Sequence, residues 1–404
     1  MKKRILFVDD ETRVLDGLRR SLRRFRDRWD TDFAESGQAA LDLLDQTTYD
    51  IVVSDMRMPG MDGFELLSIV RDKFPDTLRI VLSGQTEHDT AIRSVSISHQ
   101  FLSKPCEGDL LRAVLDRACA VRSLVIDPRH RQAVSRLGCL PSAPSLYIEL
   151  TEAMADDSNS ATDIGMIIEK DMGMTIKIMQ IVNSAYFGLS REISDIRESV
   201  SYLGLGMIRS LALAEGAFST LKGNEAFSER DYIQEQKHGM LTASIASAIS
   251  PTKELKEEAM LAGMLHDLGY LLIATLFPED FLKHREAMAL GKSGEHDETK
   301  LFGTTHGKLG AYLLGSWGLP IHVTEAVAFH HSPNSVEHSE FNTITAVHVA
   351  NGLISDLQAP REFAPFRSQI DLDYLDRLDL LDQLPIWRKT AHEIINNTLE
   401  QSDD

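Results

Sequence analysis

Apolar positions follow two different periods along the chain, and the change between them divides it into two parts. In residues 1–125, short apolar runs alternate with amphipathic stretches. Several of the runs are solidly apolar, which is typical of parallel strands that are buried on both faces of a sheet. The strands are predicted at 4–9, 31–34, 50–55, 79–84 and 100–104, and helices at 11–26, 36–46, 62–74, 87–97 and 107–125. This alternation predicts an α/β domain with a five-stranded parallel sheet.

After Asp127-Pro128 the strand-like runs stop and helical periodicity dominates, as in 161–187. Proline and glycine divide this second part into separate helices, for example at Pro251, Pro278 and Pro333. The pattern therefore predicts an all-α second part, from about residue 130 to the end of the chain.

Composition narrows the class of protein. The chain has 404 residues and a formal net charge of -19, which disfavours direct binding to DNA or to an anionic membrane. One arginine-rich stretch, 18–28, has leucines at helical spacing and is interpreted as the solvated face of a helix. Three cysteines make no disulfide framework, and no run reaches the roughly 20 apolar residues of a membrane helix. We therefore expect a cytoplasmic protein.

Polar side chains stand at the ends of the predicted parallel strands, where ligands of such sheets bind. They are Asp9, Asp10, Asp55, Ser83 and Lys104. Carboxylates gathered at one edge repel one another unless a cation lies between them, and Mg²⁺ prefers oxygen ligands of this kind. The metal would neutralise an incoming phosphoryl group, and Asp55 would be free to attack phosphorus. The pattern predicts a phosphoacceptor site.

These residues resemble the response-regulator receiver domain over 1–125. The match also includes Met58-Pro59, Asp62-Gly63 and the proline that follows Lys104. The resemblance implies a flavodoxin-like fold in which Asp55 is the phosphoacceptor. It implies that Mg²⁺ is held by Asp9, Asp10, Asp55 and the main-chain carbonyl of Arg57. It also implies that Ser83 senses the phosphoryl group, that Phe101 is the aromatic switch residue, and that the Lys104–Pro105 bond is cis.

A second set of candidate ligands lies in the helical part. These residues are His238, His266, Asp267, His306, His330 and His331. Imidazoles beside an aspartate are plausible ligands for Fe, Mn or Zn, whereas a histidine on an apolar helix is more often a core residue. The sequence leaves metal binding by this set open.

The order of these residues resembles the HD superfamily of metal-dependent phosphohydrolases, including its HD-GYP branch, with four departures. Asn351 stands where the pattern ends in aspartate, Gln234 replaces a glutamate, and Tyr270 replaces a lysine. No Gly-Tyr-Pro turn follows His331. A site without its ligating carboxylates binds a divalent metal less tightly, so we expect a degenerate site.

Four further motifs resemble the HDOD domain, an HD-related output module of bacterial regulators. They are LPSAP (140–144), NSAYFG (183–188), the following YLG (202–204) and WGLP (317–320). The resemblance covers 135–360, which leaves 126–134 as a linker and 361–404 as a C-terminal helical extension. It implies an HD-like all-α fold without a settled activity.

Together the two resemblances predict a response regulator in a phosphorelay. A sensor histidine kinase would phosphorylate Asp55, and the HDOD domain would then bind a protein effector that the sequence does not identify. The alternative is an enzyme, a phosphorylation-controlled phosphohydrolase acting on a cyclic dinucleotide. A DNA-binding output is disfavoured by charge and by the lack of a basic recognition helix. Receiver surfaces often dimerise, so a homodimer is left open.

Overall fold

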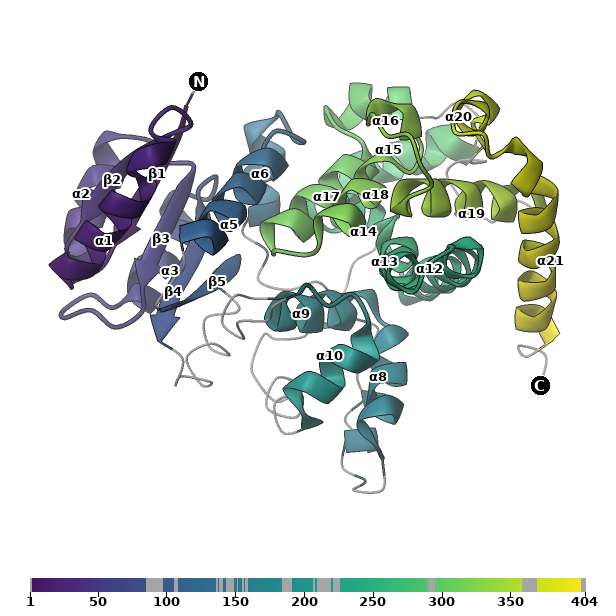
Figure 1. Ribbon diagram of the computed structural model, residues 1–404, viewed down its shortest axis with the longest axis horizontal. Helices are drawn as coiled ribbons and strands as arrows, with labels where there is room; N and C mark the ends of the chain where they lie inside the picture. Colours follow the sequence, from purple (N-terminus) through teal and green to yellow (C-terminus); the bar gives the residue numbers. More distant parts are fainter. Residues whose placement is uncertain are drawn as a thin grey trace.

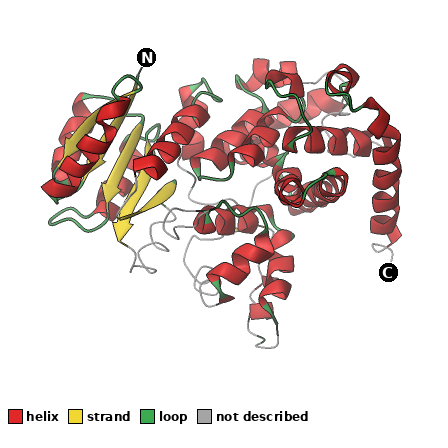
Figure 2. Cartoon of the chain, viewed as in Figure 1, coloured by secondary structure: helices red, strands yellow, loops and turns green. Residues whose placement is uncertain are grey.

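The computed structural model describes most of the chain, and the described residues form an α/β part followed by a larger helical part (Figure 1). They are 2–84, 97–104, 108–135, 137, 141–142, 149–150, 152–154, 156, 159–183, 191–205, 208, 219–220, 226–289, 295–357 and 369–400. Figure 2 shows the large sheet at the N-terminal end and helices over most of the rest.

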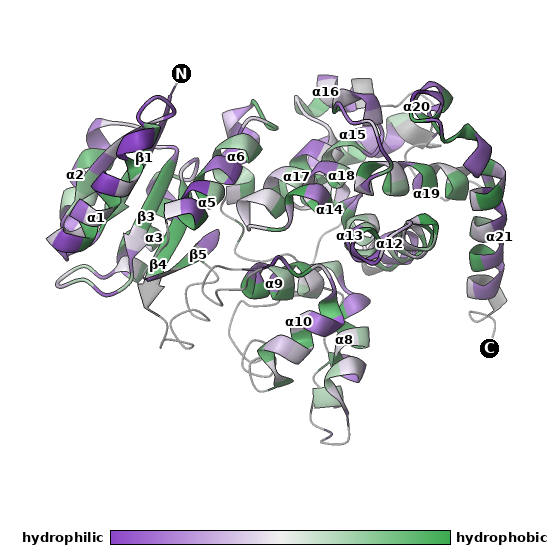
Figure 3. Ribbon diagram, in the orientation of Figure 1, coloured by the Kyte–Doolittle hydropathy of each residue, from purple (hydrophilic) through white to green (hydrophobic). Residues whose placement is uncertain are grey.

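The N-terminal part is built on a parallel sheet in the order β2-β1-β3-β4-β5. Its strands are β1 (Lys3–Val8), β2 (Trp29–Ala34), β3 (Ile51–Asp55), β4 (Leu78–Gly84) and β5 (Gln100–Lys104). The central strand β3 is hydrophobic in Figure 3, and all five of its residues are buried. The predicted parallel sheet is therefore confirmed, and all its strands end at the same edge, where the polar residues gather.

Helices cover both faces of this sheet. They are α1 (Thr12–Leu22), α2 (Gly37–Gln46), α3 (Gly63–Lys73) and α5 (Gly108–Val121). Leu15, Leu18 and Leu22 of α1 pack with Leu111 and Leu115 of α5 on one face. The predicted helix at 87–97 falls almost entirely outside the described residues.

The connection between the two parts, predicted as a linker at 126–134, contains a helix. Helix α5 ends at Val121, because Ser123 and Leu124 turn back to bond the carbonyls of α5. A new helix, α6 (Pro128–Ser135), then occupies most of this segment. Pro128 suits the first helical position, where no backbone N–H is needed, and Asp127 accepts a hydrogen bond from the Arg129 N–H.

The second part is largely helical, as predicted. The helices that carry or flank the histidines are α12 (Glu229–Ile249), α13 (Lys253–Leu265), α14 (Leu268–Leu276), α15 (Pro278–Ala289), α16 (Glu295–Phe302), α17 (His306–Ser316), α18 (Ile321–Phe329) and α19 (Thr343–Leu357). Three others, α8 (Ala161–Glu169), α9 (Met172–Val182) and α10 (Ile196–Leu203), form a group beside them (Figure 1). The all-α expectation is confirmed only in part, because β6 (Pro141–Ser142) and β7 (Ser219–Thr220) form a short parallel pair.

The last described residues form α20 (Leu372–Arg377) and α21 (Leu384–Glu400), and α21 contacts α12 and α19. Among the described residues, the helical stretch Lys253–Leu276 is apolar and long enough to cross a membrane. Its most apolar window is 78% buried inside the structure, as in a helix of a protein core.

Gly63 offers a test of the packing that supports the strand-end site. A Cβ atom at this position would lie 2.0 Å from the carbonyl oxygen of Asp55. We expect Gly63→Ala to force α3 away from β3 and to lower the free energy of unfolding by about 1–3 kcal/mol. Gly17→Ala is the control, because a Cβ on α1 meets nothing within 4 Å and alanine is the better helix former. Urea unfolding should show a lower midpoint for Gly63→Ala alone.

Candidate functional site

Three charged side chains meet at the carboxyl edge of the sheet. Asp9 directly follows β1, Asp55 ends β3, and Lys104 ends β5. The Nζ atom of Lys104 lies 2.7 Å from Asp9 Oδ2 and 2.5 Å from Asp55 Oδ1. The lysine therefore bridges two carboxylates that would otherwise repel each other.

Backbone donors hold the remaining oxygens of these two carboxylates. The Arg57 N–H donates to Asp55 Oδ2 at 2.9 Å, and the Glu11 N–H donates to Asp9 Oδ1 at 2.9 Å. Burial raises the pKa of Asp55, although the ion pair with Lys104 opposes this change. Burial disfavours the Lys104 cation, but its hydrogen bonds to Asp55 and Asp9 outweigh burial and raise the pKa of Lys104. The positive charge of Lys104 thus offsets the negative charges of Asp9 and Asp55.

The other predicted residues of this edge are placed less completely. Asp10 follows Asp9 and is exposed. Ser83 and Phe101 lie in β4 and β5, but their side chains are outside the described part of the chain, as is Pro105 with its predicted cis bond. The carboxylates of Asp9 and Asp55 both pair with the Lys104 ammonium group. Carboxylate oxygens are also the ligands that a hard ion such as Mg²⁺ prefers, so these residues fit such an ion.

A second cluster lies among the helices, and helix ends supply most of it. His266 follows the last residue of α13, Asp267 precedes α14, His306 is the first residue of α17, and His330 follows α18. His238 comes from the middle of α12. Gly269 permits the approach of α14 to α17, since a Cβ there would lie 1.9 Å from the His306 carbonyl oxygen.

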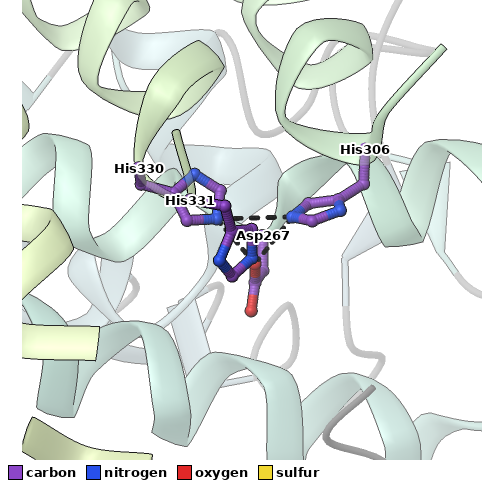
Figure 4. Close-up of side chains that lie close together, drawn as sticks. All are labelled: Asp267, His306, His330 and His331. Carbon is purple, nitrogen blue, oxygen red and sulfur yellow. Dashed lines mark hydrogen bonds and ion pairs between the residues drawn. The ribbon is translucent and has the colours of Figure 1, made fainter. Parts of the chain in front are cut away.

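Asp267 stands at the centre of the cluster (Figure 4). Its Oδ1 lies 3.3 Å from His306 Nε2 and 3.5 Å from His330 Nε2, and these two nitrogens are 3.3 Å apart. His331 adds a further nitrogen within 4.8 Å of the others. On the other side, Asp267 Oδ2 lies 3.2 Å from His266 Nε2 and 3.6 Å from His238 Nε2. The structure thus brings all six predicted residues together.

The spacing and orientation of these donors fit a metal ion. Ligands of a tetrahedral ion at ~2.1 Å lie roughly 3.4 Å apart, close to the separations around Asp267 Oδ1. His266 Nδ1 donates to the Gly263 carbonyl at 2.7 Å, and His330 Nδ1 donates to the Val327 carbonyl at 2.9 Å. Carbonyls at helix ends need such donors. Because Nδ1 carries the proton, Nε2 of each ring remains the unprotonated nitrogen that a metal binds.

The histidines of the cluster differ in the direction in which their pKa values are shifted. Burial opposes a charged imidazole, but Glu298 and Asp267 outweigh it and raise the pKa of His306 to about 10. Burial lowers the pKa of His330 to about 4, and burial with neighbouring histidines lowers that of His331 well below its usual value. Burial also opposes an ionised Asp267, but the adjacent imidazoles hold its pKa well below the ordinary range. At neutral pH His330 and His331 are therefore neutral, the form that binds metals, whereas His306 is protonated and would release its Nε2 proton on binding one.

Sequence reasoning missed two neighbours of the cluster, Glu298 of α16 and His284 of α15, which are both buried. Tyr270, which the sequence identified only as a departure from the HD pattern, donates a hydrogen bond to Glu298 at 2.8 Å. A glutamate on a short helix eight residues before His306 gave no recognisable signal. Asn351 is buried on α19, where its amide adds no charge. His348 is structural, because it bonds the His330 carbonyl and the Asp371 N–H.

Removing the lysine should change how stability depends on pH. The pKa of Asp55 is raised in the folded chain, so stability falls as pH rises from about 4 through that pKa. We expect Lys104→Met to raise the pKa of Asp55 further, which makes the fall larger and extends it to higher pH. Urea midpoints measured between about pH 4 and pH 7 test this. Lys104→Arg keeps the positive charge and should retain most of the wild-type profile.

Comparisons with known proteins match both parts of the chain. Residues 5–116 match the response regulator receiver domain and residues 140–333 match the HDOD domain. An uncharacterised protein of Treponema pallidum is 26% identical over 64% of this chain and 53% of its own length. The hydrogenase transcriptional regulatory protein HoxA of Cupriavidus necator is 35% identical over 31% of this chain and 26% of its own.

Among solved structures, the MmoQ response regulator of Methylococcus capsulatus is 24% identical, with a TM-score of 0.44 over 59% of this chain and 98% of that one. The chain spans only about half of the Treponema pallidum protein and about a quarter of HoxA. The receiver match contains the strand-end site, and the HDOD match contains the histidine cluster. The chain is therefore a response regulator in which a receiver domain is followed by an HDOD domain.

Proposed function

We propose that this chain is a phosphorylation-controlled signalling protein. A sensor histidine kinase phosphorylates Asp55 with the help of Mg²⁺, which Asp9, Asp10, Asp55 and the Arg57 carbonyl hold. Lys104 binds a phosphoryl oxygen, Ser83 senses the phosphoryl group, and Phe101 acts as the switch. The HDOD domain then binds or releases a protein effector in the cytoplasm. The chemistry rests on the carboxylates and the lysine that meet at the sheet edge.

One observation carries the proposal: strand β5 is fastened at both ends. Lys104, at its carboxyl end, pairs with Asp55. Gln100, at its amino end, donates hydrogen bonds to the carbonyls of Ser316 at 2.9 Å and Gly315 at 3.2 Å, at the end of α17. A strand of five residues therefore joins the phosphoacceptor to the output domain.

Helix α5 strengthens this contact. Arg117 donates to the carbonyls of Gly318 at 3.1 Å and Leu319 at 3.2 Å, and it pairs with Glu192 at 2.8 Å. The same turn joins α17 to α18. Because α17 begins at His306 and His330 follows α18, the receiver holds the ends of two helices whose other ends meet at the histidine cluster. A change at Asp55 is thereby given a physical route to that cluster.

The enzyme alternative has its own support, which is the convergence of Asp267 with five histidines. A bound Fe, Mn or Zn ion would act there as a Lewis acid towards a phosphodiester. Against it, Asn351 and Tyr270 replace charged groups of the HD pattern. HoxA is named a transcriptional regulator, but it matches only 31% of this chain, so no DNA-binding function is carried over.

The phosphoacceptor is tested by mass. Incubation of the full chain with acetyl phosphate and Mg²⁺ should add the mass of one phosphoryl group, because Asp55 attacks phosphorus and the acetate leaves. Chelation of Mg²⁺ and the variant Asp55→Asn should each abolish the gain. An unchanged mass in the wild-type chain, or an equal gain in Asp55→Asn, would reject this assignment.

The coupling is tested by hydrogen exchange. Phosphorylation of the wild-type chain should change amide exchange in α17, through the contacts of Gln100 and Arg117. In the double variant Gln100→Ala/Arg117→Gln we expect phosphorylation to proceed while the response of α17 disappears, since each lost hydrogen bond contributes about 0.5–1.5 kcal/mol. Arg129→Gln is the control, because Arg129 is exposed and pairs only locally, with Asp127 just before α6. A response that survives in the double variant contradicts the route.

A further inference from the structure

Glu298 is a fully buried carboxylate that the HD pattern does not account for. It lies on α16 and receives hydrogen bonds from two elements. The His306 N–H donates to Oε2 at 2.9 Å, His306 Nδ1 lies 2.9 Å from both oxygens, and the Tyr270 hydroxyl donates to Oε1 at 2.8 Å. His284 Nε2 lies 3.5 Å away. A buried charge needs partners of this number to be tolerated.

The contact with Glu298 decides which nitrogen of His306 faces the cluster. Because a carboxylate can only accept, the Nδ1 atom of His306 carries a proton, and Nε2 points to Asp267 Oδ1 at 3.3 Å and His330 Nε2 at 3.3 Å. Metal-binding histidines commonly donate their other N–H to a carboxylate, which orients the ring and makes it a stronger ligand. The Nδ1 atoms of His266 and His330 donate to carbonyls instead, so of these three rings only His306 has a carboxylate at its Nδ1 atom.

Tyr270 fixes this arrangement from the side. Its ring stacks on that of His306, with centroids 4.1 Å apart and planes 18° apart, while its hydroxyl reaches Glu298. The residue that replaces the lysine of the HD pattern therefore supports the histidine–glutamate pair. The negative charge that Asn351 does not supply is present on Glu298, one imidazole ring away from the centre.

We propose that Glu298 is the positioning carboxylate of a transition-metal site, and that Tyr270 holds it in place. The ion would be bound by Asp267, His306, His330 and His331, and its class is that of Zn²⁺, Mn²⁺ or Fe²⁺, which accept imidazole with carboxylate. Glu298 touches no metal; it acts through His306. This inference deepens the enzyme alternative and rests on metal binding at the cluster.

The experiment uses the purified full chain, stripped of metal by a chelator and then titrated with Zn²⁺. We expect Glu298→Gln to weaken Zn²⁺ affinity about 10- to 100-fold. Tyr270→Phe, which keeps the stacked ring but loses the hydroxyl, should weaken it about two- to tenfold. Glu258→Gln is the matched control, because Glu258 bonds Thr343 outside the cluster, and its affinity should equal that of the wild type.

A second readout separates positioning from loss of folding. The visible spectrum of the Co²⁺-loaded chain reports the ligand geometry, and it should change in Glu298→Gln and remain wild-type in Glu258→Gln. If Glu298→Gln does not fold, Tyr270→Phe carries the test alone. A wild-type chain that binds no Zn²⁺, or a Glu298→Gln chain that binds it as tightly as the wild type, overturns the proposal. The acetyl phosphate reaction is measured on the same samples and is independent of this site, so failure of the receiver function is seen separately.

Discussion

The structure depends on how the amino ends of β4 and β5 meet the output domain. Arg79, at the start of β4, is buried and donates to the carbonyls of Ile97 and Ser135, the latter in α6. Gln180 of α9 donates to the carbonyl of His99, just before β5. Burial lowers the pKa of Arg79 to about 9, yet at neutral pH the guanidinium stays charged and needs these acceptors. These contacts join backbone groups of one domain to side chains of the other, so the two domains pack directly against each other here. The contact lies at the amino ends of the strands, at the opposite edge of the sheet from Asp55.

Both candidate sites answer the same physical problem, which is how to keep several ionisable groups out of water. At the sheet edge one lysine lies between Asp9 and Asp55, so a single cation compensates two anions. At the helical cluster the arrangement is the opposite, because one carboxylate, Asp267, lies among several imidazoles. A second carboxylate, Glu298, pairs with the other nitrogen of His306. Buried ion pairs contribute to stability only when their remaining hydrogen-bonding groups are satisfied. The backbone N–H of Arg57 satisfies one such group of Asp55, and the carbonyl of Val327 satisfies one of His330.

The sequence predicts the features that follow from local period and strand ends. Solid apolar runs predicted the parallel strands, and the ends of β3 and β5 correctly placed Asp55 beside Lys104. Helix breakers predicted a largely helical second part, whose histidines do meet. What the sequence could not supply depends on tertiary packing. The end of α5 at Val121 results from a turn that leads into α6, and nothing in the pattern indicates that Glu298 is buried. Its burial and its three donors come from α14 and α17, elements that the chain brings together only on folding.

The interactions at the two ends of β5 differ in strength, and this difference indicates where a rearrangement at Asp55 is transmitted. At one end Lys104 holds a charged pair in a partly buried site, and phosphorylation of Asp55 would add close to two negative charges there. At the other end Gln100 makes neutral hydrogen bonds to carbonyls, each of about 0.5–1.5 kcal/mol. The coupling free energy between distant sites is typically about 1–3 kcal/mol, which is comparable to the free energy lost when those hydrogen bonds break. It is small compared with the electrostatic energy of a new charge in a partly buried site. A rearrangement forced at Lys104 is therefore taken up where β5 is held more weakly, which is at the end of α17.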